Sequence, residues 1–232
     1  MIKEIKFYYI IFFLFIFNNL YSYEIIRDPV FEEYFVDISY ELNTDDVDVY
    51  LIKSEIANAF VIKNSIYFTT GLLNVIENED TLKAIYLHEY GHLIKNHFQA
   101  KQFKTQQSIN KKLFLNLFSI GLAVVAGNTD IGLGASITLN TNLVNELSKH
   151  SINFEIEADN YMANEIRKNK INVDELKLFL NKISNNTNYY FVTHPRSIDR
   201  INNLNEFNFK KSKNSDKFNW IKSKYSKNSN IS

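Results

Sequence analysis

One five-residue string in this sequence has residue types and spacing that suit metal-dependent hydrolysis. It reads His88-Glu89-Tyr90-Gly91-His92. If the stretch is helical, residues four apart project from one face about one turn apart, so both imidazoles can reach one zinc ion. Glu89 then lies about 100° around the helix from His88, where its carboxylate can take a proton from water at an open position of the zinc. The competing interpretation is a helix with two incidental histidines and an exposed glutamate.

A catalytic zinc needs a third protein ligand, and the candidate lies on a later predicted helix. Glu155 and Asp159 are four positions apart there and so share a face. Glu155 can bind the metal, while Asp159 accepts a hydrogen bond from the distal nitrogen of a ligand histidine and fixes its tautomer. Ala158 leaves room for two helices to pack closely, and Glu157 is expected to be a surface charge. Acidic pairs at this spacing also occur on ordinary solvated helix faces.

Composition narrows the chemistry that the chain can use. The sequence has no cysteine and five histidines, so thiolate sites and disulfides are excluded and any metal must be held by His, Asp or Glu. A content of 45% hydrophobic and 22% charged residues is typical of a folded globular protein. A formal net charge of zero argues against a nucleic-acid partner. Six glycines and two prolines favour a helix-rich fold over a glycine-rich nucleotide-binding enzyme.

Periodicity places these residues in a fold that combines helices with a few short strands. The string lies in a helix expected over residues 80–98, which is apolar on two sides and should therefore be buried in the domain centre. Further helices are expected over residues 29–42, 71–78, 141–169, 173–183 and 196–204. Short strands are expected over 47–52, 59–62 and 66–69, with Asn64-Ser65 as the turn between the last two. The apolar stretch 113–126 is interpreted as core, with interfacial membrane contact as the alternative.

The two ends of the chain differ from the middle. Residues 1–22 begin with Lys3 and Lys6, continue with an uncharged apolar run over 7–17 and end at the small residue Ser22. This pattern predicts a signal peptide and an exported chain, with an uncleaved membrane anchor as the alternative. Residues 23–209 are then expected to form a single metallopeptidase domain. Residues 210–232 carry seven lysines against one aspartate, which is typical of a disordered basic tail that can touch anionic lipid headgroups.

Together these motifs resemble the zinc metallopeptidase family M48 over most of residues 28–205. The resemblance rests on the H-E-x-G-H form of 88–92, on the strand pair before that helix, on the segment around Glu155 and on Thr193-His194-Pro195. It implies an α+β, mostly helical gluzincin-type metallopeptidase domain with a small β-sheet before the active-site helix. It also implies one zinc ion held by His88, His92 and Glu155, with Glu89 catalytic. His194 is expected near the zinc, either stabilising the oxyanion or acting as a reversible fourth ligand.

The resemblance predicts a zinc metalloendopeptidase that hydrolyses protein or peptide substrates and binds no nucleic acid. The long membrane spans of the membrane-embedded relatives are missing, which favours the exported branch, periplasmic or secreted, with membrane association as an alternative. The expected role is quality control of misfolded envelope proteins, and the strand at 58–62 could bind an extended substrate by edge pairing. Two alternatives stay open. One is a chaperone-like binder whose zinc is plugged by His194, and the other is a membrane-surface binding protein with a structural zinc.

Overall fold

The first long helix, α2 (Pro29–Leu42), shows how closely local sequence determines this fold. Asp28 caps it by accepting hydrogen bonds from the backbone N–H groups of Val30 and Phe31, and proline at the first helical position suits the cap. The helix ends at Asn43, which adopts the left-handed conformation with φ 54°. The computed structural model, which describes residues 24–100, 141–184, 204 and 206–225, thus confirms the helix predicted over 29–42.

A four-stranded mixed sheet precedes the central helix, as the predicted α+β fold class requires. Its strands are β1 (Ile25–Ile26), β2 (Val49–Ile52), β3 (Ala59–Ile62) and β4 (Ser65–Thr69), in the order β1-β2-β4-β3. β2 and β4 are parallel, whereas the other two pairs are antiparallel. The β3–β4 turn is Lys63-Asn64, one residue earlier than predicted, because Ile62 pairs with Ser65 and Lys63 takes the positive φ of 55°.

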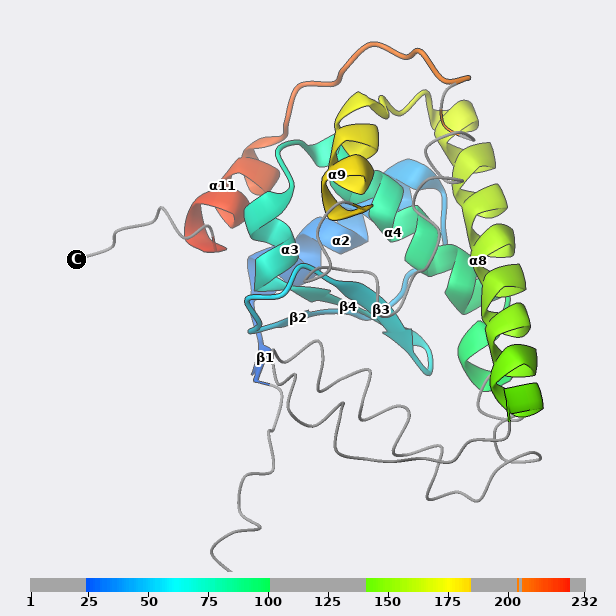
Figure 1. The fold of residues 1–232 in the computed structure, drawn as a ribbon. Helices are drawn as coiled ribbons and strands as arrows, with labels where there is room; N and C mark the ends of the chain where they lie inside the picture. Colours follow the sequence, from blue (N-terminus) through cyan, green and yellow to red (C-terminus); the bar gives the residue numbers. More distant parts are fainter. Residues whose placement is uncertain (1–23, 101–140, 185–203, 205, 226–232) are drawn as a thin grey trace, which may run out of the picture.

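The helices pack on the sheet through a cluster of aromatic rings. Phe35 of α2 stacks on Phe68 of β4 at 4.8 Å between ring centroids, and it lies 5.6 Å from Tyr86 of the central helix. All three rings are buried. In Figure 1 the sheet lies below the helices α2, α3 (Thr70–Val75), α4 (Glu79–Ile94) and α9 (Asp174–Ser184). This layer of helices forms the core with the sheet beneath it.

The central helix α4 carries the H-E-x-x-H string through the middle of the domain. Asn78 caps it by accepting a 2.8 Å hydrogen bond from Thr81 N, and every residue from Glu79 to His92 is buried. This confirms the expected burial, but the helix ends at Ile94 rather than continuing to residue 98. Lys95 and Asn96 form the break, and Asn96 has a φ of 54°. The chain therefore turns away from the helix axis just before His97.

Helix α8 (Thr141–Asn169) has the predicted bounds and packs along α4, as Figure 1 shows at the right of the molecule. The two helices lie in close contact at Gly91. A Cβ atom added there would lie 3.1 Å from Ala158 Cα and 3.2 Å from Ala158 O. A small residue on each helix thus permits the contact, as the sequence indicated. The predicted helix 196–204 and the apolar stretch 113–126 lie outside the described residues, apart from the buried Leu204.

The prediction of a disordered tail from residue 210 is wrong for residues 210–225. They form an ordered segment that ends in helix α11 (Asp216–Tyr225), packed against α2 and α3 (Figure 1). Phe218 and Ile221 are buried in the core, and Lys217 pairs with Glu33 and Asp37 of α2. Three of the lysines that suggested a solvated tail, Lys211, Lys217 and Lys224, therefore meet acidic groups of the domain.

The described residues contain no helix that is both long and apolar enough to cross a membrane.

Candidate metal centre

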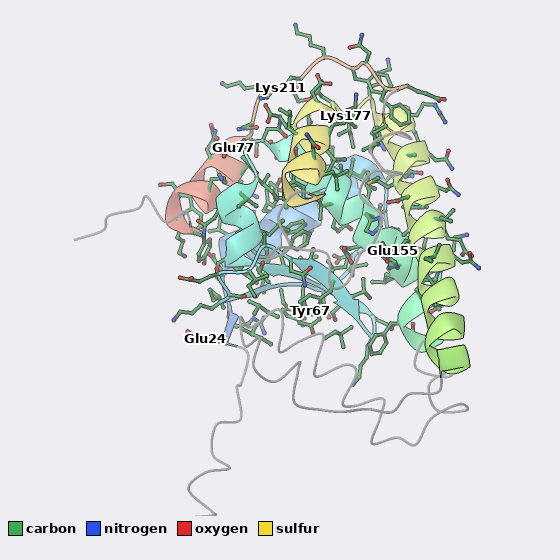
Figure 2. All side chains as sticks on the ribbon, viewed as in Figure 1. Glu24, Tyr67, Glu77, Glu155, Lys177 and Lys211 are labelled. Carbon is green, nitrogen blue, oxygen red and sulfur yellow. The ribbon has the colours of Figure 1, made fainter. Side chains whose placement is uncertain are left out.

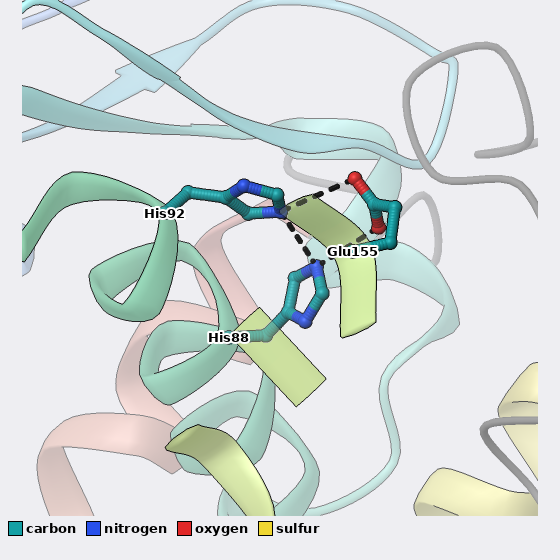
Figure 3. Close-up of side chains that lie close together, drawn as sticks. All are labelled: His88, His92 and Glu155. Atoms are coloured by element: carbon teal, nitrogen blue, oxygen red, sulfur yellow. Dashed lines mark hydrogen bonds and ion pairs between the residues drawn. The ribbon is translucent and has the colours of Figure 1, made fainter. Parts of the chain in front are cut away.

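Three buried side chains from two helices converge at the middle of α4. His88 and His92 project from α4, and Figure 2 places Glu155 on the side of α8 that faces α4. The two Nε2 atoms lie 3.1 Å apart. His88 Nε2 is 3.4 Å from Glu155 Oε2, and His92 Nε2 is 3.3 Å from Glu155 Oε1 (Figure 3). The structure therefore brings together the three residues named from the sequence as metal-ligand candidates.

The donor set fits a zinc ion. A tetrahedral zinc with bonds of about 2.0–2.1 Å to its ligands separates neighbouring ligand atoms by about 3.3 Å. The observed separations of 3.1, 3.3 and 3.4 Å agree with that value. One potential ligand atom from each of His88, His92 and Glu155 lies within 4.8 Å of the other two. Two imidazole nitrogens and one carboxylate are also the ligand types that zinc accepts.

Burial keeps one of the imidazoles in the form that binds metal. Withdrawal from water is the largest cause that lowers the pKa of His92, to about 4, although the neighbouring Glu155 acts in the opposite direction. His92 is therefore neutral near pH 7, and a neutral imidazole is the metal-binding form. The site thus needs no deprotonation of His92 before a metal can bind.

The two other acidic residues predicted at the site also lie on the expected elements. Asp159 follows Glu155 by one helical turn, and its Oδ1 lies 2.9 Å from His88 Nδ1, on the side of the ring away from Glu155. Glu89 is completely buried beside the histidines and is close enough to His92 to raise its pKa. His194 lies outside the described residues, so the structure does not place it.

Two further residues contact the site that the sequence reasoning did not assign to it. His97 Nδ1 lies 2.9 Å from His92 Nδ1, and His97 Nε2 lies 3.3 Å from Glu157 Oε2. Burial is the largest cause that lowers the pKa of His97, too. Glu157 was expected to be only a surface charge, and its side chain is 52% exposed, yet it reaches the buried His97. One sequence signal for this contact is the asparagine after the helix, a residue type that tolerates the left-handed turn.

Comparison with known families agrees with this geometry. The model of Peptidase family M48 matches residues 29–208, a range that holds α2, the β2–β4 sheet, both site helices and all three convergent side chains. A comparison with curated proteins finds no match. Since the family match covers well over half of the chain, and since the buried His88–His92–Glu155 cluster fits a zinc site, this protein belongs to the M48 family of metallopeptidases.

Proposed function

We propose that this chain is a zinc endopeptidase in which His88, His92 and Glu155 hold the metal and Glu89 is the general base. The observation that carries the proposal is the number of ligands in the cluster. Among the described residues, three side chains converge, whereas a structural zinc is usually closed by four protein ligands. Three ligands leave a position for substrate or water, which favours a catalytic over a purely structural metal.

When bound, a zinc ion supplies Lewis acidity, which makes water a stronger acid and a carbonyl carbon a better electrophile. Glu89 accepts the proton of the water whose oxygen attacks the scissile carbonyl carbon. Glu89 then donates this proton to the leaving nitrogen as the C–N bond breaks, so a carboxylic acid and an amine are released. Asp159 holds the His88 ring from behind through the 2.9 Å contact to Nδ1, which keeps Nε2 directed at the metal position.

The test compares wild type with Glu89→Gln and Glu155→Gln, using zinc content and casein cleavage as readouts. Loss of a general base costs roughly 10²–10⁴-fold in rate, so Glu89→Gln should keep its zinc and lose most of its activity. Glu155→Gln should lose zinc as well as activity, because it removes a ligand charge. Wild-type cleavage by Glu89→Gln would refute the assignment of the base.

We further propose that an extended substrate pairs with the outer side of β3 at Val61. In the described part of the sheet β3 is the last strand, and it contacts α4. Asn58 O accepts a hydrogen bond from Thr69 N, and pairing alternates along an antiparallel ladder, so the backbone N–H of Val61 points away from β4. A substrate strand on that side would lie beside the catalytic helix.

Replacing Val61 by proline removes this N–H without touching the β4 ladder. Val61→Pro should therefore lower kcat/KM for peptides, whereas Val61→Thr keeps the N–H and should leave it unchanged. Equal kcat/KM for Val61→Pro and wild type would reject edge pairing.

His194 is proposed to act next to the metal, as the family resemblance implies. A His194→Ala variant distinguishes its two roles and the chaperone-like alternative. Loss of cleavage supports oxyanion stabilisation, and gain of cleavage supports a reversible fourth ligand. No change in a protein that still binds unfolded chains supports a binding protein.

Export of the chain and a role in envelope quality control remain part of the proposal. They are supported by the basic start, apolar run and small residue of segment 1–22 and by the family resemblance. Mass spectrometry of the mature protein from cell fractions tests export. An intact residue 1 in the cytosolic fraction would refute it.

A further inference from the structure

We propose that His97 and Glu157 form a hydrogen-bonded relay that holds the ligand His92 in the tautomer able to offer Nε2 to the metal. The inference rests on the proposed metal site and adds two positioning residues to it. Its basis is a chain of short contacts, from His92 Nδ1 to His97 Nδ1 at 2.9 Å and from His97 Nε2 to Glu157 Oε2 at 3.3 Å.

The break in the backbone after α4 makes the first contact feasible. In an uninterrupted helix, residues five apart are separated by about 140° around the axis, so His92 and His97 could not meet. Helix α4 instead ends at Ile94, and Asn96 takes a φ of 54°. His97 is thereby folded back onto the last turn of α4, where its ring meets that of His92 edge to face at 5.0 Å between centroids.

The proton positions along the relay follow from the ligand geometry. His92 Nε2 faces His88 Nε2 and Glu155, so it must keep its lone pair for a metal, and the ring proton is then on Nδ1. That Nδ1–H donates to His97 Nδ1, which must therefore be an acceptor. The proton of His97 is then on Nε2 and is donated to Glu157, whose carboxylate only accepts. Each donor faces one acceptor, and the chain ends on a negative charge.

The shape of α8 explains why an imidazole must bridge this gap. Asp159 is one turn from Glu155 and can reach His88 directly. Glu157 is two positions from Glu155, about 200° around the helix, and so cannot share the face that points at the metal. His97 spans the distance between this carboxylate and His92. One helix therefore supplies a ligand, a direct support for His88 and, through His97, a support for His92.

His97 is also held firmly in the place that the relay needs. It is 4% exposed, and its ring stacks on Phe154 with 4.3 Å between centroids and an interplanar angle of 16°. Phe154 directly precedes the ligand Glu155, so a shift of His97 is coupled to the turn of α8 that carries the third ligand. A phenylalanine ring could make the same stacking contact but no hydrogen bond. The variant His97→Phe therefore separates the effect of packing from that of hydrogen bonding.

The experiment compares His97→Phe, His97→Gln, Glu157→Gln and the control Glu165→Gln, which changes an acidic residue of α8 away from the site. Zinc affinity is measured on metal-free protein by competition with a chromophoric chelator, and the stability of the same metal-free proteins is measured by urea unfolding. Nitrogen-15 NMR of the zinc-loaded proteins reports which ring nitrogen of His92 carries a proton.

Loss of a group that supports a metal ligand typically weakens metal binding about 10–100-fold, so His97→Phe should fall in that range. His97→Gln can accept from His92 and donate to Glu157, so it should recover part of the affinity. Glu157→Gln should lose less than His97→Phe, and Glu165→Gln should match wild type. Wild type should show a protonated Nδ1 on His92, and His97→Phe should show weakening or loss of that signal.

The relay is overturned if His97→Phe binds zinc as tightly as wild type. It is also overturned if, across the variants, the loss of zinc affinity merely follows the loss of stability that urea unfolding measures on the metal-free proteins. It is also overturned if His92 in zinc-loaded wild type carries no proton on Nδ1. A wild-type protein that binds no zinc overturns the proposed function together with the relay. If wild type binds zinc and cleaves casein, and His97→Phe binds zinc and cleaves casein equally well, only the relay is overturned.

Discussion

Replacing Gly91 by alanine should damage the metal site while leaving the protein folded. Gly91 lies between Glu89 and His92 on α4, opposite Ala158 of α8. An added Cβ would lie 3.1 Å from Ala158 Cα, 3.2 Å from Ala158 O and 3.3 Å from Tyr161 Cβ. Two of these atoms belong to the backbone of α8, so a side-chain rotation cannot relieve the contact and α8 itself must move.

The size of that movement can be worked out from ordinary packing distances. Carbon atoms pack best at about 3.5–4.0 Å, so α8 must retreat by at least about 0.4 Å at Ala158. Ligand distances at a metal site tolerate about 0.2 Å, and Glu155 lies one turn from Ala158. Alanine gains about 1 kcal/mol over glycine as a helix former, while overpacking costs about 1–3 kcal/mol. The net loss of about 0–2 kcal/mol is small beside the roughly 5–15 kcal/mol of a typical domain.

Zinc affinity is measured by competition with a chelator, and the stability of the metal-free protein is measured separately by urea unfolding. We expect Gly91→Ala to unfold within about 2 kcal/mol of wild type and to bind zinc at least tenfold more weakly. Asn160→Ala, on the exposed face of α8, is the matched control and should bind zinc like wild type. Wild-type zinc affinity in Gly91→Ala would refute the argument that the close approach of these helices positions Glu155.

Three further predictions follow from the same structure. Gly71→Ala should fail to fold, because the added Cβ would lie 2.3 Å from Glu55 O, a backbone atom; soluble protein with a wild-type melting curve would contradict this. Removing residues 210–232 takes the buried Phe218 and Ile221 out of the core, which costs roughly 1.5–3 kcal/mol for each side chain, and an unchanged urea midpoint would count against the packing of α11. Burial alone would raise the pKa of Asp28, but hydrogen bonds from Tyr225 and Lys224 outweigh it and hold the pKa below 3.8. The stability that Asp28 adds is therefore present above pH 3.8 and is lost as the pH falls through its lower folded pKa. Asp28→Asn, which keeps the helix cap, should unfold more easily than wild type at pH 7, and the difference should shrink as the pH is lowered below 3.8. A difference that stays the same size over this pH range would reject the pairing.

The elements that the sequence predicted well are those set by local periodicity. The 3.6-residue pattern placed α2 at 29–42 and α8 at 141–169, and the spacing of His88 and His92 placed two imidazoles on one face of α4. Glu155 and Asp159 could be predicted because acidic residues one turn apart on a second helix can supply a metal ligand and a hydrogen-bond acceptor to the two histidines. In each case the helix repeat alone decides which side chains share a face.

The features that the sequence did not reveal depend on tertiary contacts. The meeting of His97 with His92 requires the chain break at residues 95 and 96, which no hydrophobic period encodes. The lysines of segment 210–225 suggested a solvated tail because composition does not show which acidic groups will face them. In the structure Lys217 meets Glu33 and Asp37 of α2 while Phe218 and Ile221 are buried in the core, so complementary charge accompanies the apolar packing that docks this helix.

The docked C-terminal segment has a consequence for the catalytic helix, because it holds the end of α4 opposite to the relay. Glu79 accepts hydrogen bonds from Ser215 at 2.6 Å to the backbone nitrogen and 2.8 Å to the hydroxyl, and Asp80 accepts one of 3.1 Å from Ser212 N. These two carboxylates also complement the positive end of the helix dipole. At the other end His97 folds back on the last turn. Helix α4, which carries both histidine ligands, is thus fixed at both ends. The C-terminal segment, which lies beyond the family match at 208, holds its start, and His97, which follows the H-E-x-x-H string, packs on its end. A rigid helix keeps the two imidazoles aimed at one point, which a metal site needs when two of its ligands come from a single helix.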